Sequence, residues 1–271
     1  MAATGMATAG ERIDRKPDAQ VRTDRAPRIE PRTGALELKL SHHLALKYSE
    51  RDALRSLEGQ ERRVAAGEIL YLEGDRTDRL QIVASGWLHG STVIDGGARQ
   101  ILRFYFVGDV AGEGPAAWGR ASSTLTAVSG CRLYEVERAM LGRMFRDHPR
   151  LACLFYAVAM TEQAAMAQRL TSVGRTDAVC RIGTLLLELR DQLEVVDGDS
   201  GSMFELPLTL QDLGDATGLT KTHAGRVLRR LEEDGFLERD GRVLRILDVA
   251  RFAALVGYRE RVGRVLTDWM V

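Results

Sequence analysis

Basic and hydroxyl side chains recur after Lys221 at a spacing that would gather them on one side of a helix. At 100° per residue with Lys221 at zero, four further residues fall between about 40° and 140°, namely Gly225, Arg229, Thr222 and Arg226. An Arg side chain can bond guanine O6 and N7 together, and the first residues of a helix in the major groove reach base edges. The pattern therefore predicts a face that contacts double-stranded DNA, with Lys221 at its edge.

The opposite side of the same segment is apolar. Its members fall between about 240° and 340° and are Val227, Leu231, Ala224 and Leu228. Such a stripe is typical of a helix that covers a core. The competing interpretations are an ordinary solvated basic face and a protein-binding module, because exposed helices commonly carry Arg and Lys.

A pair of capped helices is predicted to position this face. Thr209 followed by Asp212 resembles a capping box, with Asp in place of the usual Glu or Gln. Leu210–Thr217 then predicts a short helix, and Gly218 lies just past its end, where a left-handed residue is favoured. Thr220 can cap a second helix that runs to about residue 234. Two short helices joined by such a turn are typical of a helix-turn-helix.

A β-hairpin is predicted directly after the second helix. Phe236–Glu238 and Arg242–Ile246 predict its strands, and Arg239-Asp240-Gly241 predicts its turn. The segment would then be a winged helix-turn-helix. Arg242 and Arg245 are expected to meet phosphates, contacts that position a protein on DNA without reading the sequence.

Upstream, the periodicity of the chain indicates a β domain followed by long helices. After a short helical region from about Leu36 to Leu57, six β-rich runs separated by Gly turns predict an antiparallel sandwich, barrel or jelly roll. The runs are Glu68–Leu72, Leu80–Ala84, Trp87–Val93, Gln100–Phe106, Thr124–Val128 and Arg132–Val136. Pro149 then opens a helix of about 20 residues whose first half is apolar nearly all round, so the β domain or a second subunit must cover it. Gly174 is expected to interrupt that helix, and a second amphipathic helix follows.

Composition limits the class of protein. Of 271 residues, 45% are hydrophobic and 28% charged, which is enough for a globular core. Lys and Arg total 38, as do Asp and Glu, so a polybasic coat is excluded while a local basic face is not. No apolar run approaches the roughly 20 residues that span a bilayer, and the N-terminal residues lack the apolar segment of a secretory signal, so we expect a cytoplasmic protein.

The residues that carry the DNA-binding prediction also carry a resemblance. The stretch from Leu208 to Leu237 resembles the DNA-binding domain of CRP/FNR-type bacterial transcription regulators, and the helix after Pro149 is similar to the dimerisation helix of that family. The β region resembles the cyclic-nucleotide-binding roll of the family at Gly67–Asp75, Ser85-Gly86, Gly108-Asp109 and Gly112-Glu113. The resemblance covers about Leu36 to Tyr258.

The N-terminal residues 1–34 contain almost no large apolar side chain, so their composition predicts a disordered tail. For the rest, the resemblance implies an α+β chain without enzymatic activity. Its parts are a cyclic-nucleotide-binding-like sensor β roll, or jelly roll (35–148), a dimerisation helix (149–173), and a winged helix-turn-helix DNA-binding domain with a C-terminal extension (174–271). The resemblance also implies a homodimer that binds a near-palindromic operator and works with RNA polymerase. Arg226 would read guanine and Lys221 would be a basic residue at the helix start. Thr222 lies where the cyclic-AMP receptor has a glutamate that accepts a hydrogen bond from cytosine. This difference puts the usual operator sequence in doubt.

The effector is less well defined by the same comparison. Gly112 and Glu113 resemble the start of the phosphate-binding cassette, whose Glu meets the ribose hydroxyl. Arg120, Ser122 and Ser123 form a degenerate version of the part that holds the cyclic phosphate, and the loop between looks short. A cyclic nucleotide is therefore one candidate effector, and another effector, or none, is the alternative.

Metal chemistry has little support in the sequence. An iron–sulfur cluster needs four thiolates, whereas the chain has three separate cysteines, and a haem would need an axial His such as His89, His42 or His43. No nucleophile–base pair or metal-ligand spacing stands out. The remaining rivals are a β-roll, cupin-like enzyme and a cyclic-nucleotide or protein-interaction module that does not bind DNA.

Overall fold

The computed structural model of the chain describes residue 1 and residues 34–197, 201–259 and 265–270. The predicted disordered tail (1–34) therefore lies almost wholly outside the described residues. Residues 198–200, part of the run Asp197–Ser202 whose Gly, Asp and Ser residues predict a surface loop, also lie outside them. Among the helices that are described, none is both long and apolar enough to cross a membrane.

Two four-stranded antiparallel sheets form the β roll, which confirms the predicted β domain. One sheet has the strand order β1-β8-β3-β6 and the other has the order β2-β7-β4-β5. The strands are β1 (Glu61–Val64), β2 (Ile69–Tyr71), β3 (Arg79–Ser85), β4 (Leu88–Val93), β5 (Arg99–Tyr105), β6 (Val110–Ala111), β7 (Thr124–Ala127) and β8 (Cys131–Glu137). The six predicted runs correspond to six of these strands. Sequence periodicity missed β1, in which three of the four residues are charged, and β6, which has only two residues and is too short to show alternation.

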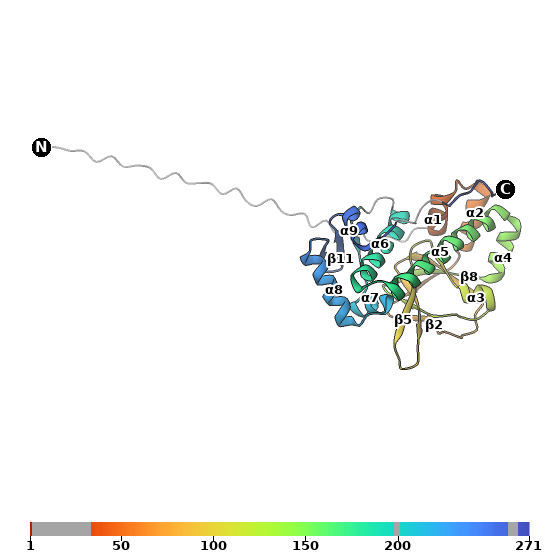
Figure 1. The fold of residues 1–271 in the computed structure, drawn as a ribbon. Helices are drawn as coiled ribbons and strands as arrows, with labels where there is room; N and C mark the ends of the chain where they lie inside the picture. Colours follow the sequence, from red (N-terminus) through yellow and green to blue (C-terminus); the bar gives the residue numbers. More distant parts are fainter. Residues whose placement is uncertain (2–33, 198–200, 260–264, 271) are drawn as a thin grey trace.

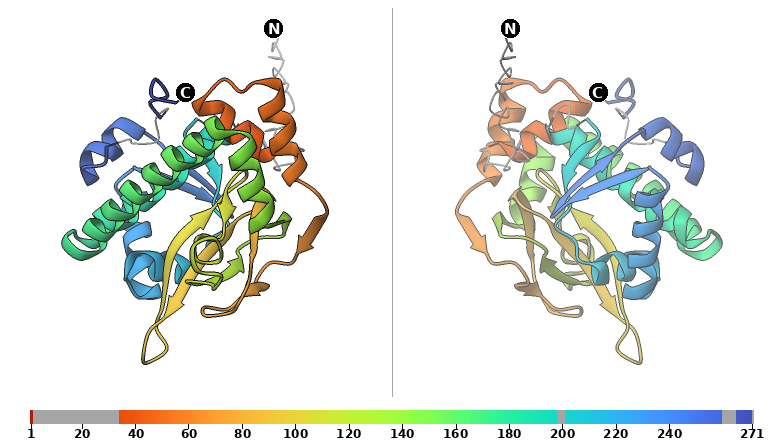
Figure 2. Two further views of the ribbon diagram at one scale, coloured as in Figure 1. Left: turned by 90° about the vertical axis from the view of Figure 1, so that its right-hand side faces the viewer. Right: turned by 90° about the vertical axis from the view of Figure 1, so that its left-hand side faces the viewer.

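Short helices cover the roll (Figures 1 and 2). They are α1 (Ala35–His43), α2 (Tyr48–Leu57), α3 (Glu113–Trp118) and α4 (Arg138–Asp147). The predicted helical region before the roll is thus two helices, and their residues Leu36, Leu40 and Leu54 are buried in one cluster with Leu151 of the next helix. The sequence reading missed α3, a six-residue helix that contains Gly and Pro and so lacks a helical pattern.

A single long helix, α5 (Pro149–Arg175), joins the roll to the C-terminal part. Pro149 fits its first turn because the N–H that proline lacks has no partner there. The prediction that Gly174 interrupts this helix is wrong. Gly174 lies inside the last turn, and the helix ends at Arg175, after which Thr176 is extended. Asp177 then caps the next helix, α6 (Ala178–Asp197), by accepting from the backbone N–H of Cys180 at 2.8 Å.

The C-terminal part is a winged helix-turn-helix unit, as predicted. It contains β9 (Met203–Glu205), α7 (Leu210–Thr217), α8 (Lys221–Glu233), β10 (Leu237–Asp240), β11 (Val243–Ile246) and α9 (Val249–Val256). The predicted hairpin is β10–β11, and β9 adds a third strand in the order β10-β11-β9. We refer to residues 178–256 as the DNA-binding unit.

The DNA-binding unit packs against the roll rather than standing apart from it. Trp87, Ile101, Phe104 and Phe106 of the roll belong to the same buried cluster as the core of α6, α7 and α8. Figure 1 shows α7 beside β5, and the two elements are in contact. A continuous apolar core therefore connects the sensor roll to the helix pair.

Candidate DNA interface and effector cavity

The start of α7 is held by a reciprocal capping box. The Thr209 hydroxyl accepts from the backbone N–H of Asp212 at 3.1 Å, and the Asp212 carboxylate accepts from the backbone N–H of Thr209 at 2.9 Å. Gly218 ends the helix in the left-handed conformation, at φ +67°. The predicted limits of α7 are therefore confirmed, and Asp serves here as well as the usual Glu.

A glycine that sequence reasoning overlooked brings the two helices together. A Cβ atom on Gly214 would lie 2.5 Å from the carbonyl oxygen of Leu219, in the turn between α7 and α8. Only a residue without a side chain lets the turn pass so close to α7. The available signal was a glycine inside a short helix, which costs about 1 kcal/mol relative to Ala unless packing requires it.

The second helix presents the face that its periodicity predicts. The Thr220 hydroxyl caps α8 by accepting from the backbone N–H of His223 at 3.2 Å. All four residues of the apolar stripe are buried: Ala224, Val227, Leu228 and Leu231. On the opposite side Lys221, Thr222, Arg226 and Arg229 are exposed.

Gly225 has a different environment from the other residues of this face. It is half-buried, and a Cβ atom there would lie 3.3 Å from Leu210 Cδ1 of α7. Packing within the helix pair is therefore one reason for a glycine at this position.

The exposed basic side chains of α8 differ in their partners. Arg230 pairs with Asp234 at 3.5 Å, and Arg239 of the wing pairs with Glu232 at 2.5 Å. Within the described part of the chain, Arg226 and Arg229 form no such ion pair. Their guanidinium groups are available to an external partner.

The two arginines of the wing are also unequal. Arg242 is exposed, and its side chain has no ion pair among the described residues. Arg245 lies opposite Glu238 in the hairpin and forms an ion pair with it at 3.5 Å. Arg242 is therefore the stronger candidate for a phosphate contact.

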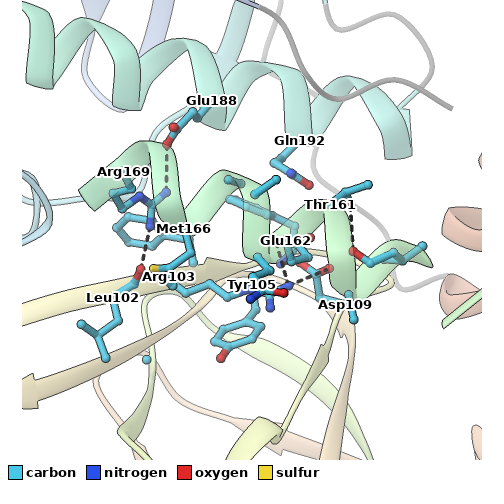
Figure 3. A pocket seen from close by; sticks show the side chains of 18 of the residues that line it. Leu102, Arg103, Tyr105, Asp109, Thr161, Glu162, Met166, Arg169, Glu188 and Gln192 are labelled. Atoms are coloured by element: carbon cyan, nitrogen blue, oxygen red, sulfur yellow. Dashed lines mark hydrogen bonds and ion pairs between the residues drawn. The ribbon is translucent and has the colours of Figure 1, made fainter. Parts of the chain in front are cut away.

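A cavity of about 680 Å³ separates the roll from α5 and α6 (Figure 3). Of the residues predicted to bind an effector, Glu113, Ser122 and Ser123 line it. Gly112 and Arg120 are not among its lining residues. The Arg120 guanidinium instead donates to the carbonyl of Gly74 at 3.2 Å, so the structure brings together only part of the predicted set.

Arg103 occupies the polar side of this cavity and engages Glu113. Its guanidinium lies 2.9 Å from Glu113 and 3.2 Å from Glu162 of α5, and it stacks over the ring of Tyr105 (Figure 3). Burial opposes the charge of Arg103, but Glu162 and the other surrounding groups outweigh it and raise the pKa of Arg103. The Tyr105 hydroxyl donates to Glu113 at 2.9 Å. Glu113 is thus already bound by two residues of β5.

The other cations of the cavity also have carboxylate partners. Lys39 pairs with Asp109, and Arg169 of α5 pairs with Glu188 of α6 at 3.0 Å. No Lys or Arg that lines the described cavity therefore lacks a carboxylate partner. This donor set, with Arg120 outside, does not fit a cyclic phosphate unless an ion pair opens.

Arg103 was missed at the level of sequence, although a signal was present. The signal is a single charged residue within the otherwise apolar or aromatic run Leu102–Phe106. A charge in such a run has to find a partner inside the protein. For metals, the described residues contain no group of three or more His, Cys, Asp or Glu placed to hold an ion.

Comparison with known proteins agrees with this architecture. Residues 61–148 match the family model of the cyclic nucleotide-binding domain, and residues 180–255 match that of the Crp-like helix-turn-helix domain. The nitrogen fixation regulation protein FixK of Azorhizobium caulinodans is 31% identical over 180 residues, which cover 63% of this chain and 72% of the relative. The transcriptional activator protein FnrA of Stutzerimonas stutzeri is 28% identical over 214 residues, covering 79% and 87% respectively.

Solved structures show the same fold. FixK2 from Bradyrhizobium japonicum superposes with a TM-score of 0.65 at 24% identity, over 74% of this chain and 98% of that one. The global regulator CLP of Xanthomonas campestris superposes with a TM-score of 0.58 at 21% identity, over 79% and 99%. A roll of the cyclic-nucleotide-binding fold, a long helix and a Crp-like helix-turn-helix thus follow one another as in these relatives, and the chain belongs to the CRP/FNR-type family of bacterial transcription regulators.

Proposed function

We propose that this regulator reads DNA through the outward face of α8 and touches the phosphates beside it with the wing. The observation that carries the proposal is that Arg226 and Arg229 project from a helix whose opposite side is buried. Arg226 would bond a guanine, and Lys221 and Thr222 would reach neighbouring bases or phosphates at the start of the helix. Arg242 would contact the backbone.

The protein would act as a homodimer. Helix α5 buries Leu151 and Leu154 on one side but leaves Tyr156 and Leu170 60% and 75% exposed on the other. Apolar side chains exposed along one long helix are suited to a two-fold contact with the same helix of a second copy. Two-fold symmetry requires a near-palindromic operator with half-sites roughly 34 Å apart. Its other partner would be RNA polymerase, in the cytoplasm, as for the family.

We further propose that the cavity beside Arg103 is the effector site. It lies where the roll, α5 and α6 meet, so a ligand there contacts both the sensor and the helix that leads to the DNA-binding unit. Glu113, Ser122 and Ser123 would contact such a ligand. A cyclic nucleotide would have to draw Arg103 away from Glu113 and Glu162, which favours an effector that leaves these ion pairs in place.

Selection of genomic fragments by the purified protein, with and without cyclic AMP, tests both proposals. We expect enrichment of fragments that share a near-palindromic motif, and no change in the motif or the affinity on addition of cyclic AMP. Failure to enrich any motif would contradict the DNA-binding proposal. A cyclic-AMP-dependent gain in affinity would instead contradict the inference that the effector leaves the ion pairs of Arg103 in place.

A further inference from the structure

An arginine of the roll forms ion pairs with the first helix of the helix-turn-helix. Arg99, at the start of β5, places Nη2 2.5 Å from Asp212 Oδ1 and Nε 2.6 Å from Asp215 Oδ2. These partners are 113 and 116 positions away in the sequence. We call the three residues the interdomain fork.

The surroundings of the fork favour a fixed geometry. The side chains of Asp212 and Asp215 are only 14% and 8% exposed, and that of Arg99 is 32% exposed. Burial raises the pKa of Asp212, but hydrogen bonds from Thr209 and the Arg99 guanidinium outweigh it and lower that pKa overall. The Asp212 carboxylate is therefore charged at neutral pH. Two charge-assisted hydrogen bonds from one planar guanidinium constrain direction as well as distance.

The fork adds orientation to the apolar packing between β5 and α7. Ile101 and Phe104 of β5 share a buried cluster with Leu213 and Ala216 of α7. Apolar burial holds two surfaces together without prescribing an angle between them. Because Asp212 also belongs to the capping box of α7, the fork acts on the fixed start of this helix, to which α8 is joined by a short turn.

The same strand connects the fork to the effector cavity. Gly90 pairs with Arg103 and Ser91 with Ile101, so Leu102 is the extra residue of a β-bulge. The carbonyl of Leu102 accepts from Arg169 of α5 at 2.9 Å (Figure 3). Strand β5 thus carries the cavity arginine, a contact to α5 and the fork within five residues, Arg99 to Arg103.

We propose that Arg99 is a positioning residue for DNA recognition: through Asp212 and Asp215 it sets the angle of α7 and α8 relative to the roll. In a dimer this angle determines how far apart the two α8 helices lie and which way they face. The inference rests on the proposed DNA-binding function. By this inference, a movement of Arg103 in the cavity would be transmitted along β5 to the orientation of the recognition helices.

The affinity for operators with altered half-site spacing tests the inference, because a residue that only stabilises the fold would not change how affinity depends on spacing. Each inserted base pair moves the half-sites apart by about 3.4 Å and rotates them by about 35°. A rigid dimer should lose about tenfold or more in affinity on a one-base-pair insertion, because its second helix no longer meets its half-site. In Arg99→Ala we expect weaker binding to the native spacing and an insertion penalty of less than about threefold.

Three further variants make the test specific. Asp215→Asn keeps the size of the side chain and an acceptor for Gln211, which donates to Asp215 at 2.6 Å, but it removes the charge. It should reduce the penalty in the same direction but by less, because the bond from Arg99 to Asp212 remains. Arg99→Ala/Asp215→Asn should behave as Arg99→Ala alone, as for residues that act together. Arg79→Ala removes an exposed ion pair within the roll, to Glu137 at 3.4 Å, and should behave as the wild type.

The possible outcomes separate the two proposals. If the wild type selects no operator, the proposed DNA-binding function is wrong, and that result does not depend on the fork. If the wild type binds but Arg99→Ala and Asp215→Asn keep its affinity and its insertion penalty, the inference is overturned. Circular dichroism and the dimer mass are measured for each variant, and if Arg99→Ala does not fold, Asp215→Asn decides by the same criterion.

Discussion

At the scale of single residues, Arg226 carries the sharpest expectation. Arg226→Ala should cost about 1–3 kcal/mol at the cognate operator and relax discrimination at one base pair, since a bidentate guanine contact is lost. Arg230→Ala is the matched control, because Arg230 is exposed but already paired with Asp234. Binding titrations against single-base operator variants measure both. An unchanged base preference in Arg226→Ala would show that another face of α8 meets the bases.

The buried His89 beside the interdomain fork predicts a pH dependence of stability. Its Nε2 atom lies 3.5 Å from Nη1 of Arg99, whose guanidinium also pairs with Asp212 and Asp215. Burial, and then the Arg99 charge, lower the pKa of His89 to about 4, against 6.5 for an unperturbed His. Between these values the unfolded chain binds more protons than the folded one, so the free energy of unfolding falls as the pH falls from 6.5 to 4.

His89 should contribute about 3 kcal/mol to this loss, which is the free energy that corresponds to the difference between its two pKa values. Urea unfolding at several pH values measures it for the wild type and for His89→Gln, which cannot take up the proton. The variant should lose less stability over this interval. Equal pH slopes for the two proteins would mean that His89 is not held neutral by its surroundings.

At the scale of elements, the close contact between α7 and the following turn depends on Gly214. Gly214→Ala should lower the free energy of unfolding by about 1–3 kcal/mol, because the new methyl group meets the carbonyl of Leu219. Gly142→Ala in α4, where a Cβ atom meets nothing within 4 Å, should raise it by about 0.4–1 kcal/mol. Thermal unfolding compares the two. Destabilisation by both changes would point to a general effect of replacing helical glycines.

The wing is expected to bind DNA without reading its sequence. Arg242→Ala should weaken binding to all sequences alike and reduce the slope of log affinity against log salt concentration by about 1, since one phosphate contact is lost. Arg245→Ala should have a smaller effect, because Glu238 already neutralises part of that charge. Titrations at several salt concentrations measure the slopes. A loss confined to one operator sequence would indicate a base contact instead.

At the scale of the whole molecule, the exposed side of α5 should join two copies. Leu170→Asp places a charge where a 75% exposed leucine would otherwise be covered, so the dimer should dissociate and operator binding should fall with it. Leu72→Asp in the roll, where the leucine is 53% exposed, is the control and should remain dimeric. Sedimentation velocity reports the mass. A dimeric Leu170→Asp protein would exclude this part of α5 from the interface.

A series of contacts joins the cavity to the helix-turn-helix. The cavity, β5 and the interdomain fork form one connected series from Glu162 of α5 to Asp215 of α7. Met270, near the C-terminal end, is buried in the cluster of α1 and α2, so the end of the chain also returns to the sensor part (Figure 1). The DNA-binding unit is thus held by the roll at several points.

Local patterns in the sequence determined the helix pair, its caps, the outward face of α8 and the order of roll, helix and wing. These features depend on residues within a few positions of one another, so spacing alone defines them. The tertiary structure decided the rest. Arg99 and Arg103 meet carboxylates that lie far away in the chain, Arg120 turns away from the cavity, and Gly225 meets α7, because such contacts depend on how finished elements pack and not on the pattern within any one of them.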